Sequence, residues 1–261
     1  MSSQFYSSEQ TERSREVLDE VLATVPDAIL IGGWGTWVRT GGPMSHDIDL
    51  ILSRADLEVL EGIVDDLSVS RHLSGTKWRA TWRSIHLDLY VPHQSRLGTN
   101  LQLRTERLAA YQERHGPYRV LSVPAHLATK LAALLDRPDS LPGRKDRTEI
   151  LTLLPDPAAA ATPAVLEEAS ARSDAERRTL VAKAFEYLAA DASLDRAARD
   201  RLRRTAKAWL AHSSAAPTPE GGLPRDPPTL GRPDGSRSRR VAAPGSLGSG
   251  ESQHRGPRPH A

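Results

Sequence analysis

The chain has 261 residues, of which 38% are hydrophobic and 26% are charged, and its formal net charge is +2. It contains no cysteine, which excludes a disulfide scaffold, a Cys-ligated zinc or iron–sulfur site and thiol catalysis. No run approaches the ~18 apolar residues of a membrane-spanning helix, and residues 1–15 lack the basic and apolar regions of a secretory signal. We therefore expect a soluble, cytoplasmic protein.

The positive charge is concentrated in the last part of the chain. Residues 213–261 carry seven Arg against two Asp and two Glu, so the high isoelectric point does not by itself indicate a nucleic-acid-binding domain. Pro, Gly, Ser and Arg make up 31 of these 49 residues, a composition that buries too little apolar surface to offset the entropy of ordering. We expect a disordered tail over 213–261.

Apolar spacing predicts an alternation of strands and helices before residue 155. The pattern predicts, in chain order, a helix over 10–24, a strand at 28–31, a helix starting at 34–39, a strand at 47–52, a helix from a Ser53–Asp56 capping box to about residue 67, strands at 68–72, 77–83 and 85–91, a helix over 102–113, a strand at 118–123, and helices over 124–136 and 145–153. This order indicates an α+β domain with a mixed β-sheet of four or five strands flanked by helices.

The chain changes character where Pro155 and Pro163 bracket a run of alanines, because only helical patterns follow. The predicted organisation is a domain over 1–154, a linker over 155–163, a small helical extension over 164–212 and the tail.

The last predicted helix has a basic side and an apolar side. Leu202 and Trp209 lie opposite the basic residues, so we expect this helix to dock by its apolar side, with a basic surface for RNA phosphates as the alternative. The basic side consists of Arg196, Arg199, Arg203 and Lys207.

Two carboxylates stand out on a strand with a buried pattern. Asp47 and Asp49 are two residues apart, so they leave the same face of the strand, and their apolar neighbours indicate that the strand is buried. Because a buried, unpaired carboxylate pair is costly, a divalent cation between them is the simplest explanation. Hard oxygen ligands without cysteine favour Mg²⁺ or Mn²⁺.

A third carboxylate and a glycine pair complete the pattern. Asp88 alternates with leucines on another strand, where it either joins Asp47 and Asp49 or pairs with a nearby arginine such as Arg79 or Arg83. Glycines between a strand and a helix allow a phosphate to approach the backbone closely, and Gly32-Gly33 has this position. Three carboxylates near such a turn are typical of two-metal phosphoryl transfer.

Ile31-Gly-Gly followed by Asp47-Ile-Asp-Leu resembles the signature of the DNA polymerase β-like nucleotidyltransferase superfamily, over about residues 15–155. The resemblance implies Mg²⁺-dependent transfer of a nucleoside monophosphate from an NTP, the co-substrate, to a hydroxyl. It implies that Asp47, Asp49 and Asp88 bind metal and that Gly32 and Gly33 bind the triphosphate.

The second half of the domain is similar to the abortive-infection (AbiEii-type) nucleotidyltransferase toxins. The similarity lies in residues 122–137 and in Gly143-Arg-Lys-Asp-Arg-Thr-Glu-Ile150. It implies that Lys130 and Lys145 contact the nucleotide phosphates and that Asp146 contributes a catalytic carboxylate, which leaves the general base open between Asp88 and Asp146. From the residues alone, Lys130 lies on the flank of an apolar stripe, where a lysine at the surface is the alternative.

The resemblance also bears on the acceptor. It implies RNA, in particular tRNA, in a toxin–antitoxin or phage-defence setting with a cognate antitoxin. A small molecule is the alternative, because Gly32-Gly-Trp34 before a His-Asp-Ile-Asp run is also similar to the lincosamide and aminoglycoside nucleotidyltransferases. A third alternative is an inactive nucleotide-binding module.

Overall fold

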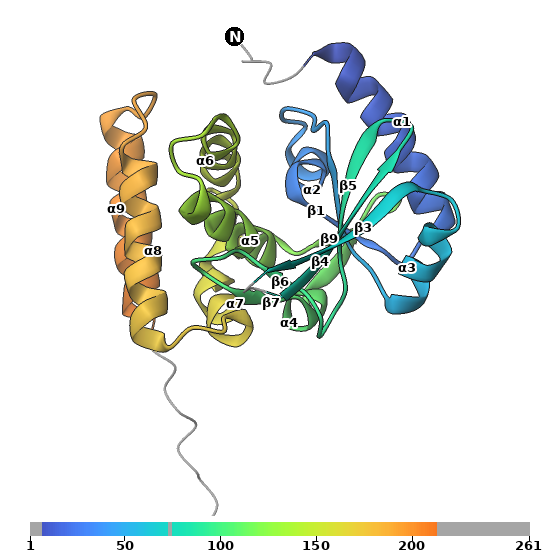
Figure 1. Ribbon diagram of the computed structural model, residues 1–261. Helices are drawn as coiled ribbons and strands as arrows, with labels where there is room; N and C mark the ends of the chain where they lie inside the picture. Colours follow the sequence, from blue (N-terminus) through green and yellow to red (C-terminus); the bar gives the residue numbers. More distant parts are fainter. Residues whose placement is uncertain (1–6, 73–74, 213–261) are drawn as a thin grey trace, which may run out of the picture. The chain divides into compact units, whose positions relative to one another are not determined.

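A seven-stranded mixed sheet organises the computed structural model, which describes residues 7–72 and 75–212 (Figure 1). Helices cover both faces of the sheet, which confirms the predicted α+β class, with seven strands in place of four or five. In the order β3-β4-β5-β2-β1-β9-β8, the strands are Asp65–His72, Gly75–Trp82, Ile85–Tyr90, Ile48–Ile51, Ile29–Ile31, Tyr118–Leu121 and Gln112–His115. The short strands β6 (Arg96–Leu97) and β7 (Leu103–Arg104) form a separate ribbon.

Local sequence signals explain where helices begin. Ser53 and Asp56 form the predicted capping box, in which each side chain accepts a hydrogen bond from the backbone N–H of the other residue. Pro124 lies in the first turn of its helix, where the missing N–H costs nothing. The helices are α1 (Ser8–Thr24), α2 (Gly32–Thr40), α3 (Arg54–Glu61), α4 (Thr105–Ala109), α5 (Val123–Asp136), α6 (Leu141–Leu153), the 3₁₀ helix η1 (Pro157–Ala161), α7 (Thr162–Ala169), α8 (Asp174–Ala189) and α9 (Arg196–Ala211).

The alternation of side chains along the central strands separates two hydrophobic clusters. Leu30 and Leu50 belong to the cluster that α1 and α3 cover, whereas Ile31 and Ile51 belong to the cluster that α5 covers. By the same period of two, Asp49 on β2 lies on the α5 side. Apolar residues therefore bury β2 on both faces, and the carboxylate of Asp49 lies on the face toward α5.

The predicted helix from Ser53 to about residue 67 ends earlier in the structure. α3 stops at Glu61, and β3 begins at Asp65, three residues before the predicted strand. β3 pairs with β4 in an antiparallel ladder. Pairing with a neighbouring strand therefore outweighs the local helical pattern in this segment.

The predicted helix over 102–113 is also wrong in extent, because only α4 is helical there. Leu103 pairs with β6 on one side of α4, and β8 forms a hairpin with β9 on the other. Gly116 closes this hairpin with φ +59°, a conformation that favours glycine. Tertiary packing divides this segment: Leu103 of β7 and Leu108 of α4 lie in the α5 cluster, together with Leu101, which precedes β7.

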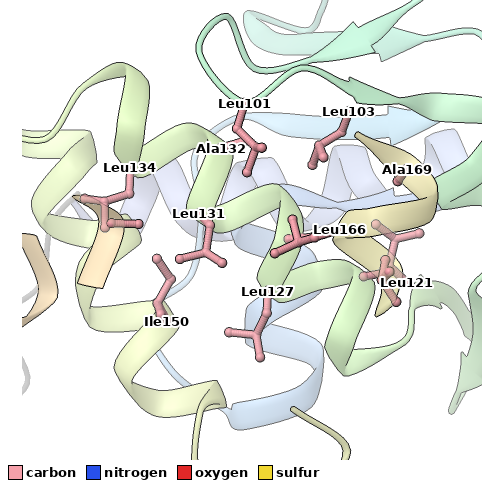
Figure 2. Close-up of a cluster of buried hydrophobic side chains, with 14 of the residues drawn as sticks. Leu101, Leu103, Leu121, Leu127, Leu131, Ala132, Leu134, Ile150, Leu166 and Ala169 are labelled. Carbon is pink, nitrogen blue, oxygen red and sulfur yellow. The ribbon is translucent and has the colours of Figure 1, made fainter. Parts of the chain in front are cut away.

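The segment over 155–163, predicted as a linker, is helical in the structure. It contains η1 and the start of α7, and Ala159 is 3% exposed. Small alanine side chains let this segment approach α5 closely, which the proline and alanine content alone did not indicate. Leu166 and Ala169 of α7 lie in one cluster with Leu127 and Leu131 of α5 (Figure 2).

The last described helices, α8 and α9, complete the same cluster. Phe185 and Trp209 pack edge to face, with ring centroids 5.3 Å apart. α9 therefore docks by its apolar side as predicted, while Arg203 on the basic side pairs with Asp200 at 2.7 Å. The predicted tail over 213–261 lies outside the described residues. Within 7–72 and 75–212, no helix has the length and apolar character to cross a membrane.

Candidate active site

The Gly32–Gly33 turn joins β1 directly to α2, which begins two residues earlier than predicted. Gly32 has φ +65°, and a Cβ built there would overlap the carboxylate of Asp49. Ile31 and Asp49 are register partners in the antiparallel pair of β1 and β2, which brings the acidic strand against the turn. Only glycine fits at position 32 for both reasons.

The carboxylates predicted to bind metal lie beside this turn. Asp49 and Asp88 are register partners in the parallel pair of β2 and β5, and Asp47 lies just before β2. Burial, followed by repulsion from Asp88, raises the pKa of Asp49 to about 6. The three carboxylates therefore lie near the start of β2, where burial and mutual repulsion disfavour the charged form of Asp49.

Two cations of β4 contact Asp88. Lys77 forms an ion pair with its carboxylate, and Arg79 Nε lies 3.6 Å from Oδ1. The alternative that the sequence left open for Asp88, a pair with Arg79, is thus present together with a contact to Lys77.

The acidic group fits a divalent cation in part. Asp47 Oδ1 is buried and has no hydrogen-bond partner among the described residues, although its Oδ2 lies 3.3 Å from His46 Nε2. At Asp49, burial and the repulsion from Asp88 outweigh the attraction of Lys77 and Lys130. In the described part of the chain, no three His, Cys, Asp or Glu side chains are grouped as a ready metal site. Asp47 and Asp49 are the residues whose chemistry fits a cation, with Asp88 beside them.

Basic residues of α5 and α6 form the opposite wall. Lys130 is 5% exposed, so it is a buried residue and not the surface lysine that its place on the helix allowed. Its Nζ lies 3.2 Å from Asp146 Oδ1 and 2.5 Å from Glu149 Oε2. Burial lowers the pKa of Lys130, but Glu149 and Asp146 outweigh burial and leave that pKa above its usual value.

Lys145 and Asp146 are buried within α6, which begins at Leu141, four residues before the predicted helix start. Lys145 Nζ lies 3.2 Å from Ser45 Oγ, and a Cβ built at Gly33 would lie 2.7 Å from the same Nζ. The ammonium of Lys145 therefore lies at the glycine turn. Burial lowers its pKa, although Glu149 acts in the opposite direction.

One cleft of about 380 Å³ contains every residue predicted for the site. The turn and the acidic strands form one wall, and α5 and α6 form the other. The predicted residues that line the cleft are Gly32, Gly33, Asp47, Asp49, Asp88, Lys130, Lys145 and Asp146. The structure brings them together, and their chemical roles remain predictions.

The sequence interpretation missed four residues around this cleft. Lys77 lies two residues before Arg79 on one face of β4, and Arg137 pairs with Asp146 at 2.8 Å. Glu149 follows Lys145 by one helical turn, and this i,i+4 spacing was a usable signal. His126 lies behind the turn, where its Nε2 is 2.9 Å from Thr36 Oγ1 and burial holds its pKa well below the usual value.

No protein-family model matches the chain, and no curated protein matches it. Among solved structures, it is similar to JHP933 from Helicobacter pylori, with 11% identity, a TM-score of 0.40, and coverage of 78% of this chain and 92% of that chain. It is also similar to an antigenic nucleotidyltransferase-like protein from Paracoccidioides brasiliensis, with 16% identity, a TM-score of 0.42, and coverage of 77% and 94%.

Replacing Gly33 by Ala is expected to weaken nucleotide binding about tenfold or more, the equivalent of one charge-assisted hydrogen bond. The added methyl group would lie 2.7 Å from both Lys145 Nζ and Ser45 Oγ, so it occupies the space between the turn and the lysine. Titration calorimetry with NTP and Mg²⁺ measures the effect. Gly62→Ala is the matched control, because its Cβ makes only an ordinary contact with Val59 O at 3.5 Å. Equal affinities for the two variants would contradict a phosphate site at Gly33.

Proposed function

We propose that the chain is a Mg²⁺-dependent nucleotidyltransferase that transfers a nucleoside monophosphate from an NTP to a hydroxyl of an acceptor. One observation carries the proposal: a glycine turn, an acidic strand pair and buried lysines, from elements separated by more than 100 residues along the chain, line one cleft. The glycine turn and Lys145 suit a triphosphate, and the carboxylates suit the cation that accompanies it.

The residues of the cleft have different roles: the glycines and Lys145 bind phosphate, and the carboxylates bind the cation. Gly32 and Gly33 admit the triphosphate to the backbone at the start of α2, and Lys145 neutralises part of its charge there. Asp47 and Asp49, with Asp88, would hold Mg²⁺, which supplies neutralisation of the phosphate charge during transfer. Most of the rate enhancement then comes from positioning and charge neutralisation at the α-phosphate.

For the general base, exposure favours Asp88 over Asp146. Both carboxylates contact two cations, but the side chain of Asp88 is 28% exposed, whereas that of Asp146 is 2% exposed between α5 and α6. Asp88 is register partner to Asp49 and lines the cleft. In the proposed reaction, the acceptor oxygen attacks the α-phosphorus and its proton passes to Asp88. The bond to the bridging oxygen breaks, and pyrophosphate leaves.

The acceptor in this proposal is RNA, in particular tRNA, and the setting is a cytoplasmic toxin or phage-defence protein with a cognate antitoxin. These details rest on the resemblance of residues 122–150 to the abortive-infection group.

Transfer of label from each α-labelled NTP, with Mg²⁺, to total RNA and separately to a panel of aminoglycosides and lincosamides tests the function. We expect label on RNA, and loss of that label in Asp49→Asn. Label on a drug would show that the acceptor is a small molecule and not RNA. The protein would then be an antibiotic nucleotidyltransferase. NTP binding without transfer to either acceptor would favour the inactive nucleotide-binding module. No binding of any NTP by folded protein would overturn the proposal.

A further inference from the structure

Glu149 lies behind the cleft, between its two lysines. The side chain of Glu149 is 2% exposed, and Oε2 lies 2.5 Å from Lys130 Nζ. Its other oxygen, Oε1, lies 3.9 Å from Lys145 Nζ. Glu149 does not line the cleft itself, whereas both lysines do. One buried carboxylate thus faces the two ammonium groups of the basic wall.

The two buried carboxylates of α6 have different partners. Asp146 pairs with Lys130 and with Arg137, at the end of α5. Of the two, Glu149 is the one with an ion pair to Lys145 among the described contacts, at 3.9 Å. Asp146 therefore ties α6 to α5, and Glu149 links Lys130 to the lysine at the glycine turn.

The charge balance depends on Glu149. Burial acts against the charged form of both lysines, and Glu149 is the largest opposing influence on the pKa of each. An amide at this position would keep the shape of the side chain but leave the two buried ammonium groups with only Asp146 and the smaller influence of Asp49. Mutual repulsion would then push Lys130 and Lys145 apart.

We propose that Glu149 is a positioning residue that holds the ammonium of Lys145 at the Gly32–Gly33 turn, where it meets the triphosphate of the NTP. This inference rests on the proposed function. Glu149 acts through Lys145, so it affects recognition of the phosphates and leaves recognition of the nucleoside unchanged.

The test compares Glu149→Gln with the wild type by titration calorimetry, using ATP, GTP, CTP and UTP with Mg²⁺, and the matching nucleoside monophosphate. We expect the dissociation constant of the preferred NTP to rise about tenfold, the equivalent of one charge-assisted contact. We expect the affinity for the monophosphate to change less than about twofold, because it lacks the phosphates that Lys145 would meet. A merely structural role would weaken both ligands alike.

A double-mutant cycle with Lys145→Met shows whether Glu149 acts through that lysine. In the Lys145→Met background, Glu149→Gln is expected to change NTP affinity by less than about twofold. If the fold-changes in NTP affinity of the two substitutions multiply in the double variant, the inference is overturned. A folded Glu149→Gln protein with wild-type NTP affinity would overturn it as well. Glu168→Gln is the control for the change of charge, because Glu168 lies on α7 and pairs with Arg107 at 3.7 Å, outside the cleft.

A second variant covers the case in which Glu149→Gln does not fold. Glu149→Asp keeps a buried carboxylate on this side of Lys130 but shortens its reach toward Lys145, so it is expected to fold and still lose NTP affinity. Wild-type NTP affinity in this variant would overturn the inference. If the wild-type protein binds no NTP, the proposed function fails as well, whereas binding that is insensitive to Glu149 overturns only its role.

Discussion

Replacing Asp49 by Asn is expected to reduce nucleotide transfer by about 10²–10³-fold or more, and to stabilise the metal-free protein at neutral pH. The loss of activity follows from the place of Asp49 against the glycine turn, where it would hold the cation. The gain in stability follows from its raised pKa, which reflects burial and repulsion by Asp88. Residues that serve a site in this way often cost stability.

The sign and pH window of the stability change follow from linkage. The carboxyl of Asp49 has a pKa of about 6 in the folded protein against 3.8 as its usual value, so folded protein binds this proton more tightly. Ionisation therefore removes stability as pH rises from about 4 to about 6, by up to about 3 kcal/mol. The advantage of Asn is complete above that window and vanishes below it.

Thermal melts in EDTA between pH 4 and pH 8 measure this change, at roughly 2–4 °C per kcal/mol for a protein of this size. Asp27→Asn is the control, because Asp27 pairs with Arg119 at the surface. Adding Mg²⁺ is expected to raise the melting temperature of the wild type more than that of Asp49→Asn. An Asn variant that is less stable than the wild type at pH 7.5 in EDTA would contradict the electrostatic account of this strand.

Replacing Lys130 by Met is expected to destabilise the protein by about 3–5 kcal/mol, the range for removing one partner of a buried ion pair. The lysine is 5% exposed and contacts Asp146 and Glu149, which would remain buried without it. A lysine at the surface would instead change stability by less than about 0.5 kcal/mol. Urea unfolding separates these two outcomes.

Two further variants make the test specific to the buried charge. Lys207→Met removes an exposed lysine of α9 and is expected to leave the unfolding midpoint unchanged. Adding Glu149→Gln to Lys130→Met removes one of the uncompensated carboxylates, so we expect it to restore part of the lost stability. A double variant less stable than Lys130→Met alone would show that packing, and not charge, explains the loss.

Parts of the fold were predictable because their causes are local. The Ser53–Asp56 box caps α3 as predicted, and the apolar runs around Leu30 and Leu50 form central strands. The predicted elements were wrong where a segment could form either a helix or a strand. The segment over 102–113 was predicted as one helix, but strand pairing at Leu103 and at β8 leaves only α4 helical. Pairing partners lie elsewhere in the chain, so spacing alone does not decide between these options.

The sequence by itself indicated the glycine pair and the acidic residues that line the cleft, because these residues carry local signals. Gly32 and Gly33 follow a strand at the start of a helix, and Asp49 lies on a buried strand with Asp47 just before it. Tertiary structure alone decided how these groups are paired and buried. Lys77 reaches Asp88 only because β4 lies beside β5, and Glu149 reaches Lys130 only because α6 docks on α5. Ion pairs and burial depend on how distant elements pack, and that packing sets the charge state in which the cleft would work.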